Sequence, residues 1–236
     1  MEIYQFLITL LLWIMAKKQL TLLQQKYLDV AKLFHWGRQI DFTAWFTGVW
    51  DPRNKQTETT LPQLVEMNKL YSCWYHGQLI YTTSKRASEL HVPHGMTCTI
   101  AAIRFKHAIE CEFIPERFFR GRRFEIVPEF AFMTDKAGIA FEYSTKNNFK
   151  RPSLMRRKLQ KYRETLARFE ETFDVRPVVL FVIDAPIYEV KRFAKYGDAN
   201  FYFTDARSFF GVDMKAQLTS SIYIWGGDGD TYSLRS

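Results

Sequence analysis

The chain has 236 residues, of which 47% are hydrophobic and 25% are charged. This composition excludes a disordered chain, and the length suffices for one large or two small domains. The formal net charge is +8, and most of the excess falls in residues 93–170, which hold 16 Lys and Arg against 9 Asp and Glu. We therefore expect a polyanionic partner to contact the middle third of the chain.

Cysteine usage and hydropathy indicate where the protein works. Cys73, Cys98 and Cys111 are odd in number and widely spaced, and no Cys-x-x-Cys pair occurs. Neither a disulfide framework nor a zinc site is predicted, and a reducing bacterial cytoplasm is the expected location. The apolar run over residues 6–16 is too short to cross a bilayer and lacks the features of a signal peptide, so we expect a buried helix and no membrane contact.

Residues 1–92 are predicted to form a first domain, in which helices precede a hairpin. Thr60 is expected to cap the third helix with Pro62 in its first turn, and His76-Gly77 suits a tight turn between two strands. The predicted elements are helices over residues 3–16 and 21–33, a structured loop or small helix over 35–55, a helix over 57–67, and strands over 70–75 and 78–83.

Three helices followed by a hairpin are the order of a winged helix-turn-helix domain. In that arrangement the helix over residues 57–67 enters the major groove of DNA and the hairpin flanks the phosphate backbone. The alternative is a small helical domain that contacts another protein. The side chains predicted to face DNA are Lys55, Gln56, Thr57, Thr59 and Gln63 from the helix, and Lys85 and Arg86 after the hairpin.

Residues 93–236 are predicted to form a second, α/β (α+β) domain with a mixed central sheet. Its long helix is marked by one continuous apolar stripe, made of Met155, Leu159, Tyr162, Leu166, Phe169 and Phe173. A Gly- and Asp-rich loop over residues 226–230 precedes a last short strand. The other predicted elements are a helix over residues 94–107, a strand over 112–115, two strands around a turn at 134–138, the long helix over 153–173, a strand over 178–183, a helix over 187–196 and a strand over 199–204.

The two strands around residues 134–138 carry the outline of a nuclease site. They would bring the carboxylates of Glu129 and Glu142 close together at adjacent strand positions. Two such carboxylates hold a divalent ion that polarises a phosphate and activates water. A lysine two residues after the second carboxylate usually completes the site, but that position is Ser144.

Several short blocks resemble the replication-relaxation family, whose members are accessory factors of plasmid replication and mobilisation. The blocks are Pro128-Glu129, Phe141-Glu142-Tyr143-Ser144-Thr145-Lys146, Arg157-Lys158-Leu159-Gln160-Lys161-Tyr162 and Pro177-Val178-Val179-Leu180-Phe181-Val182. The resemblance covers nearly the whole chain. It implies an N-terminal winged helix joined to a degenerate PD-(D/E)xK domain, which has the restriction-endonuclease-like fold.

The resemblance also assigns roles to residues of the nuclease outline. It puts Glu129 at the position usually held by aspartate, Glu142 at the second carboxylate and Ser144 at the catalytic lysine. Serine removes the charge that would stabilise the transition state, so we expect an inactive scaffold that retains affinity for phosphate. The substitutes for the missing lysine are Lys146 and Lys158, and an additional ligand would be Glu116. We expect no cofactor, and Mg²⁺ at Glu129 and Glu142 only if the site is active.

Basic residues crowd the segment from Thr145 to Arg163, which contains no acidic residue. An ordinary solvated helix face mixes both signs of charge, so this asymmetry favours contact with phosphates. Tyr162 lies on the apolar stripe and is predicted to belong to the core, and His94 is interpreted as structural. The residues predicted to bind DNA here are Lys146, Lys150, Arg151, Arg156, Arg157, Lys158 and Lys161.

Taken together, these patterns predict a DNA-binding accessory protein of a plasmid or mobile element. It would bind double-stranded DNA at or near an origin and assist a relaxase or a replication initiator without cutting DNA itself, with a homodimer left open. Two alternatives remain. One is an active metal-dependent nuclease of the same fold, and the other is a scaffold whose basic face binds an acidic protein.

Overall fold

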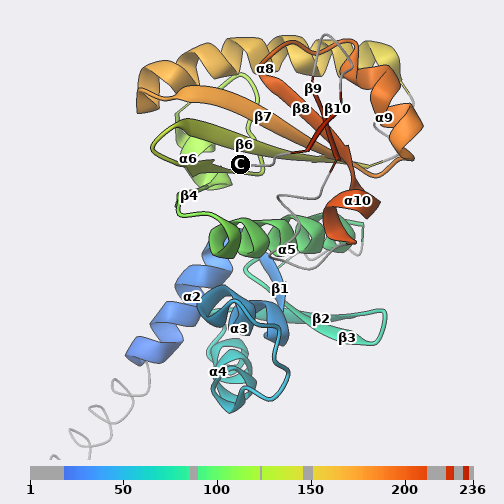
Figure 1. Cartoon of the computed structure of the whole chain (residues 1–236). Helices are drawn as coiled ribbons and strands as arrows, with labels where there is room; N and C mark the ends of the chain where they lie inside the picture. Colours follow the sequence, from blue (N-terminus) through green and yellow to red (C-terminus); the bar gives the residue numbers. More distant parts are fainter. Residues whose placement is uncertain are drawn as a thin grey trace, which may run out of the picture. The chain divides into compact units, whose positions relative to one another are not determined.

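A computed structural model describes residues 19–85, 90–122, 124–145 and 151–211, and the strands over residues 222–225 and 231–233. Contacts divide the chain into two units, Met1–Met96 and Thr97–Ser236 (Figure 1). The boundary predicted from the sequence lies after residue 92. The helix predicted over residues 3–16 and the loop predicted over 226–230 lie outside the described residues. Among the helices that are described, none combines the length and the apolar character needed to cross a membrane.

The described part of the first unit consists of helices and a small antiparallel sheet with the strand order β1-β3-β2. The predicted hairpin is confirmed, and its two turn residues, His76 and Gly77, have positive φ angles of 46° and 73°. Positive φ at both positions is what a two-residue type I′ turn requires. The elements are α2 (Leu22–Phe34), β1 (Trp36–Arg38), α3 (Gln39–Thr47), α4 (Lys55–Glu66), β2 (Tyr71–Tyr75) and β3 (Gln78–Thr82).

The segment predicted as a loop or small helix over residues 35–55 contains both a strand, β1, and a helix, α3. A strand of three residues has no periodic pattern of its own. It exists because it pairs with β3, where Trp36 lies opposite Thr82. The helix α3 ends at Gly48, which adopts the left-handed conformation with φ 74° that glycine tolerates best.

The helix α4 begins six residues earlier than a cap at Thr60 would allow. Its N-cap is Asn54, whose side chain accepts a hydrogen bond from the backbone N–H of Thr57 at 3.2 Å. The prediction that Thr60 caps the helix is wrong, because Thr60 is buried inside it. Pro62 also lies inside the helix, where its missing N–H costs one intrahelical hydrogen bond.

The second unit is built on a mixed sheet with the strand order β10-β9-β8-β7-β6-β5-β4. The strands β6, β7 and β8 run parallel, whereas the other neighbouring pairs are antiparallel. The α/β class and the mixed sheet predicted from the sequence are therefore confirmed. The elements are α5 (Val92–Ala108), which begins in the first unit, β4 (Glu112–Pro115), α6 (Glu116–Gly121), β5 (Phe130–Met133), β6 (Ala137–Ser144), α8 (Pro152–Phe173), β7 (Arg176–Ile183), α9 (Ile187–Ala194), β8 (Phe201–Asp205), α10 (Ala206–Phe210), β9 (Ile222–Trp225) and β10 (Thr231–Ser233).

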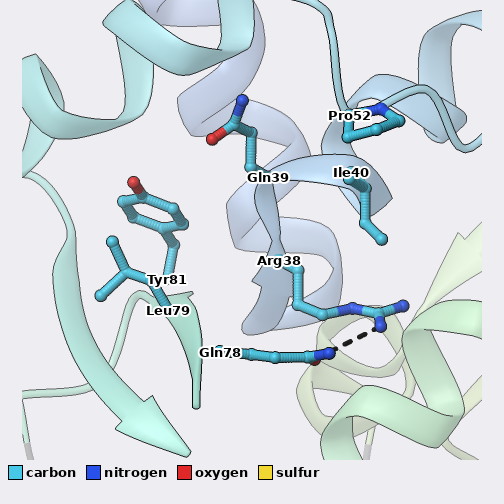
Figure 2. A pocket seen from close by; sticks show the side chains of 7 residues that line it. All are labelled: Arg38, Gln39, Ile40, Pro52, Gln78, Leu79 and Tyr81. Atoms are coloured by element: carbon cyan, nitrogen blue, oxygen red, sulfur yellow. Dashed lines mark hydrogen bonds between the residues drawn. The ribbon is translucent and has the colours of Figure 1, made fainter.

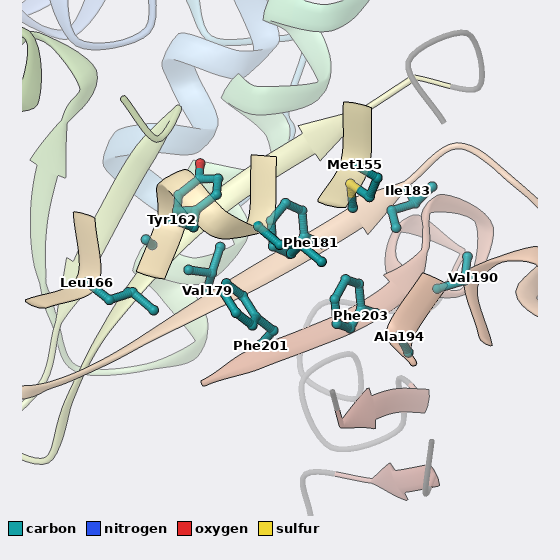
Figure 3. Close-up of a cluster of buried hydrophobic side chains, with 12 residues drawn as sticks. Met155, Tyr162, Leu166, Val179, Phe181, Ile183, Val190, Ala194, Phe201 and Phe203 are labelled. Carbon is teal, nitrogen blue, oxygen red and sulfur yellow. The ribbon is translucent and has the colours of Figure 1, made fainter. Parts of the chain in front are cut away.

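One face of this sheet is covered by α8 and α9. Figure 3 shows Met155, Tyr162 and Leu166 of α8 beside Phe181 of β7 and Phe203 of β8, in one buried cluster. The apolar stripe predicted for the long helix is confirmed, because its first five members are buried and the last, Phe173, is half-buried. Successive residues of a strand face opposite sides of a sheet. Accordingly, Glu142 of β6 faces α8, as its contacts there show.

The other face of the sheet packs against α5. The ring of Phe105 lies 5.0 Å from that of Phe132 and 6.1 Å from that of Phe141, measured between ring centroids. Phe141 is also stacked on Phe130 of the neighbouring strand at 4.5 Å. Aromatic pairs in this range stabilise a core beyond the area that they bury. The sheet is thereby held between α5 and α8 (Figure 1).

Candidate functional site

The helix α4 presents a polar face on the outside of the first unit. Lys55, Gln56, Thr59 and Gln63, four of the five side chains predicted to face DNA from this helix, are exposed. Their spacing places them together, opposite the buried face of the helix. One of them, Gln63, makes a side-chain hydrogen bond at 3.0 Å with Gln24 of α2.

The fifth residue, Thr57, is fully buried, and its prediction as a DNA contact is wrong. Its hydroxyl lies 2.9 Å from the hydroxyl of Tyr27 and 2.8 Å from that of Thr43. These contacts join α4 to α2 and to α3 in the interior of the unit. Thr57 therefore determines how α4 is held and does not contact a partner.

The hairpin contributes an exposed aromatic residue and a basic one. Lys85, just after β3, is exposed as predicted, whereas Arg86 lies outside the described residues. Trp74 of β2 has 69% of its surface exposed, close to the turn of the hairpin. Trp74 was not among the residues predicted to contact DNA, although the alternation of side chains along β2 puts it on the outer face, opposite the half-buried Cys73 and Tyr75.

A shallow cavity of about 280 Å³ lies in the first unit (Figure 2). The Arg38 guanidinium at its wall makes two hydrogen bonds of 2.8 and 2.9 Å to the carboxylate of Asp41 and one of 3.4 Å to Gln78. The charge of Arg38 is therefore paired with the Asp41 carboxylate. The hydrogen bonds to Asp41 raise the pKa of the guanidinium. The lining residues are Arg38, Gln39, Ile40, Pro52, Gln78, Leu79 and Tyr81.

In the second unit, the two carboxylates of the predicted nuclease site are neighbours. The register that pairs Phe130 with Phe141 places Glu129 opposite Glu142, and the backbone N–H of Glu129 donates to the carbonyl of Phe141 at 3.1 Å. Glu142 is buried, while Glu129 is half-buried. The sequence pattern had indicated this adjacency, since both residues flank the same hairpin turn.

The Glu142 carboxylate is held by two groups from α8. The Lys158 ammonium forms an ion pair with one oxygen, and the Tyr162 hydroxyl donates to the other. Burial raises the pKa of Glu142, the Lys158 charge lowers it, and the charge of Glu129 raises it again. Burial also raises the pKa of Tyr162 well above its usual value, so this phenol is a hydrogen-bond donor.

The position predicted for a catalytic lysine holds a buried serine. Ser144 is the last residue of β6, and its carbonyl accepts a hydrogen bond from Asp184 at 2.9 Å. The ammonium beside Glu142 comes instead from Lys158, one of the two substitutes named from the sequence. The other substitute, Lys146, lies outside the described residues.

Glu116 does not join the two carboxylates as a ligand in this structure. It lies at the start of α6 and accepts a 2.9 Å hydrogen bond from Arg120, one turn later. Among the described residues, the potential metal ligands that come together are instead His94, Cys98 and Glu129, whose donor atoms all lie within 4.8 Å of one another. The signal that sequence analysis missed is the i, i+4 spacing of His94 and Cys98, which places both on one face of α5.

The Cys98 thiol is buried beside three carboxylates. Burial raises its pKa well above the usual value, and the charges of Glu129, Glu142 and Glu116 raise it further. The thiol also makes a side-chain hydrogen bond with Glu129. In the absence of a metal ion, Cys98 is therefore a protonated and unreactive thiol.

Basic side chains lie on the outer side of α8. Arg151, Arg156 and Arg157 are exposed, and Lys161 is half-buried. Lys158 forms an ion pair with Glu142. The remaining two residues predicted here, Lys146 and Lys150, lie outside the described residues. Among the described residues, the ion pair with Glu142 removes Lys158 from the predicted basic surface.

The helix α9 adds cations to this basic surface that the sequence analysis did not select. Arg156 lies over the ring of Tyr196 at 4.4 Å from its centroid. A hydrogen bond from Arg156 lowers the pKa of Tyr196, and the charges of Arg156, Arg192 and Lys195 lower it further. The three cations thus converge on one phenol from two helices, which only the packing of α9 against the sheet could reveal.

The described residues offer a polar helix face with a hairpin, a basic surface on α8 and α9, and a buried carboxylate cluster. Comparisons with protein-family models, with curated proteins and with solved structures find no match to this chain. Its function is therefore inferred from these surfaces and from the resemblance of its short motifs.

Proposed function

We propose that this chain is a DNA-binding accessory protein of plasmid or mobile-element replication, relaxation or conjugative mobilisation. It binds double-stranded DNA at or near an origin, and it does not cut DNA. The observation that carries the proposal is the exposed polar face of α4, with Lys55, Gln56, Thr59 and Gln63, next to the β2–β3 hairpin. Amide and ammonium groups on a helix of this kind are the groups that read base edges in the major groove.

The element order of the first unit supports a winged helix-turn-helix. Its order α2-β1-α3-α4-β2-β3, with β1 at the edge beside β3, is the order expected for that domain. In this assignment α4 is the recognition helix and the hairpin is the wing. Trp74 on the wing then adds an aromatic surface that contacts the sugar-phosphate backbone or a base edge.

The second unit supports a grip on the phosphate backbone. Four exposed cations lie on neighbouring elements: Arg156 and Arg157 of α8, Arg192 of α9 and Lys195 just after α9. Phosphate contacts of this type fix the position of a protein on DNA and make its affinity depend on salt. The order α5-β4-α6-β5-β6-α8-β7 of this unit, in which the short helix α6 follows the first strand, is compatible with the restriction-endonuclease-like fold that the resemblance implies.

We propose that the protein does not cut DNA because the Glu142 carboxylate already has hydrogen-bond partners within the protein. Its two oxygens are already bound by Lys158 and Tyr162, and Ser144 is buried where the catalytic lysine is expected. A hydrated Mg²⁺ ion between Glu129 and Glu142 would have to displace these buried contacts. The protein would then act by binding, bending or local melting of DNA beside a relaxase or a replication initiator.

The direct test measures binding to a pool of origin-containing fragments at two salt concentrations. The double variant Gln56→Ala, Gln63→Ala should lose its preference for one fragment by about 10-fold or more, the lower range for removal of specific base contacts. Its non-specific affinity should change little. Gln160→Ala, an exposed glutamine on α8, is the matched control and should retain the preference.

Two outcomes would contradict this proposal. Equal affinity for all fragments, unchanged by the α4 substitutions, would remove α4 as a recognition helix. No salt-dependent binding to any fragment would remove DNA as the partner, and it would favour the scaffold whose basic face binds an acidic protein.

A second candidate function, a metal-dependent DNA nuclease, is favoured by one observation. Lys158 brings an ammonium group to Glu142 from α8, which supplies the type of charge that Ser144 lacks. Incubation of supercoiled plasmid with the protein and Mg²⁺ or Mn²⁺ separates the two functions. Nicking that disappears in Glu142→Ala, but persists in the exposed control Glu110→Ala, would establish the nuclease and overturn the binding-only proposal.

A further inference from the structure

We propose that His94, Cys98 and Glu129 form a binding site for a thiophilic divalent transition-metal ion of the Zn²⁺ class. Each residue offers one donor atom, and the three atoms lie within 4.8 Å of one another. This site shares Glu129 with the expected magnesium pair, but a thiol and an imidazole replace Glu142 as its other ligands.

The secondary structure fixes the positions of the three ligands. His94 and Cys98 are separated by one turn of the continuous helix α5, so their side chains leave the helix on the same face. Glu129 precedes β5 and is held there by its backbone hydrogen bond to Phe141. Donors bound to tetrahedral zinc at ~2.0–2.3 Å lie roughly 3.3–3.8 Å apart, so small side-chain rotations suffice to close the site.

The donor set determines which metal fits. Thiolate and imidazole ligands favour Zn²⁺ and related ions, whereas Mg²⁺ prefers oxygen ligands alone. One thiolate and one carboxylate balance the two positive charges of the ion. When the metal binds, the Sγ–H bond of Cys98 breaks, a metal–sulfur bond forms, and the proton passes to solvent.

Burial of the site supports a bound ion as well. Cys98 is buried, and His94 and Glu129 are half-buried, so the ligands are partly shielded from competing water. The three protein ligands would leave the fourth position of a tetrahedral ion to water. Catalytic zinc sites have this coordination pattern.

The test uses the reduced full chain after removal of metal by a chelator. Titration with Co²⁺ should produce the visible absorption of tetrahedral cobalt and a sulfur-to-cobalt charge-transfer band, and both should saturate at one ion per chain. Zn²⁺ should abolish both signals, and excess Mg²⁺ should leave them unchanged. No saturable cobalt signal, or displacement of cobalt by Mg²⁺, would overturn the proposal.

Variants identify the ligands. Cys98→Ser should lose the charge-transfer band, and Cys98→Ser, His94→Gln and Glu129→Gln should each weaken binding by more than about 100-fold, the upper range for loss of an outer contact. Cys111→Ser and His107→Gln are matched controls, since neither residue belongs to the cluster, and they should bind cobalt like the wild type. Persistence of the charge-transfer band in Cys98→Ser would overturn the proposal.

A folding control keeps the result interpretable. Each variant is compared with the wild type by far-ultraviolet circular dichroism before titration. If Cys98→Ser does not fold, Glu129→Gln decides the question, because Glu129 is half-buried and glutamine preserves its shape. Unchanged cobalt affinity in folded Glu129→Gln would exclude this residue and refute the three-ligand site.

Discussion

The Glu142 carboxyl group lies inside the protein with an ammonium and a phenol of α8 as its hydrogen-bond donors. Burial raises its pKa, and Lys158 counteracts this increase. A group whose pKa is raised by folding contributes its full stability below the unfolded pKa, and this contribution is lost as the pH rises through the folded pKa. Glu142 therefore makes the folded state less stable in neutral solution than in mildly acidic solution.

The substitution Lys158→Met should increase this dependence on pH. Without the ammonium, the pKa of Glu142 rises further, because burial and Glu129 are no longer opposed by Lys158. Breaking a buried ion pair costs about 3–5 kcal/mol, so we expect a loss near the lower end at pH 8 and a smaller loss at pH 4. Urea denaturation at both pH values measures the free energy of unfolding.

The control for this prediction is Lys161→Met, which removes a half-buried lysine from the same helix. It should change the free energy of unfolding by less than about 1 kcal/mol at either pH. An equal loss at pH 4 and pH 8 in Lys158→Met would show that Lys158 stabilises the fold by packing and not through the charge of Glu142.

At the scale of elements, the start of α4 depends on one side chain. Asn54 caps the helix through Thr57, which is also the residue that joins α4 to α2 and α3. The cap and the buried hydroxyl contacts thus act on the same turn. A change at either position affects where the exposed face of α4 begins.

Removal of the cap in Asn54→Ala should lower the free energy of unfolding by about 1 kcal/mol, the usual cost of an unsatisfied helix N-terminus. Asn54→Asp should retain the stability, because aspartate accepts the same hydrogen bond and adds a negative charge at the positive end of the helix. Thermal unfolding of both variants provides the comparison. A loss of similar size in Asn54→Asp would mean that the side-chain oxygen is not what stabilises the helix.

The packing of α8 on β6 requires the absence of a side chain at Gly138. A Cβ atom there would lie 2.3 Å from Cε1 of Phe169, which is fully buried and packed against Phe119 and Phe173. Gly138→Ala should therefore cost about 1–3 kcal/mol of stability through overpacking. Chemical denaturation should show no such loss in Gly121→Ala, where a Cβ meets nothing within 4 Å.

The elements that sequence analysis located correctly carry their signal locally. The stripe from Met155 to Phe169 repeats at the helical period, the apolar run of β7 needs a fully buried strand, and His76-Gly77 prefers the type I′ turn. Each of these patterns depends on residues that are close in the sequence. They were therefore visible without knowledge of the packing.

The features that sequence analysis missed depend on contacts between distant residues. β1 exists only through β3, Thr57 is buried only because Tyr27 and Thr43 meet it, and the pairing of Lys158 with Glu142 follows from how α8 lies on the sheet. The pair of His94 and Cys98 is different, because its i, i+4 spacing on α5 is a local signal that can be predicted from the sequence.

For the whole molecule, the positive charge matters most where no carboxylate neutralises it. Lys158 and Arg163 pair with Glu142 and Asp198, so they contribute little to an external field. Arg156 and Arg157 near the start of α8 are exposed, so their charges face the solvent on the basic surface of α8 and α9. If the chain grips DNA as proposed, these two arginines carry much of its sensitivity to salt.

The double variant Arg156→Ala, Arg157→Ala should bind all DNA fragments more weakly. The plot of log affinity against log salt should become less steep by about 1.8, because each lost phosphate contact accounts for ~0.9. The preference among fragments should remain, as phosphate contacts carry no sequence information. Fluorescence anisotropy over a salt series measures both quantities, with Lys136→Ala at the β5–β6 turn as the control.

The hydrogen bonds that link the buried hydroxyl groups of Tyr27, Thr57 and Thr43 in the first unit run in one direction. Thr43 donates its proton to the carbonyl of Gln39 at 3.3 Å, so it accepts from Thr57, and Thr57 in turn accepts from Tyr27. Each hydroxyl has a single proton, hence this is the one polarity that satisfies all three. Because of this direction, removing one hydroxyl has a different consequence from removing another. Loss of the phenol oxygen at Tyr27 leaves Thr57 still able to donate, whereas loss of the hydroxyl at Thr57 leaves Tyr27 with a buried proton and no acceptor.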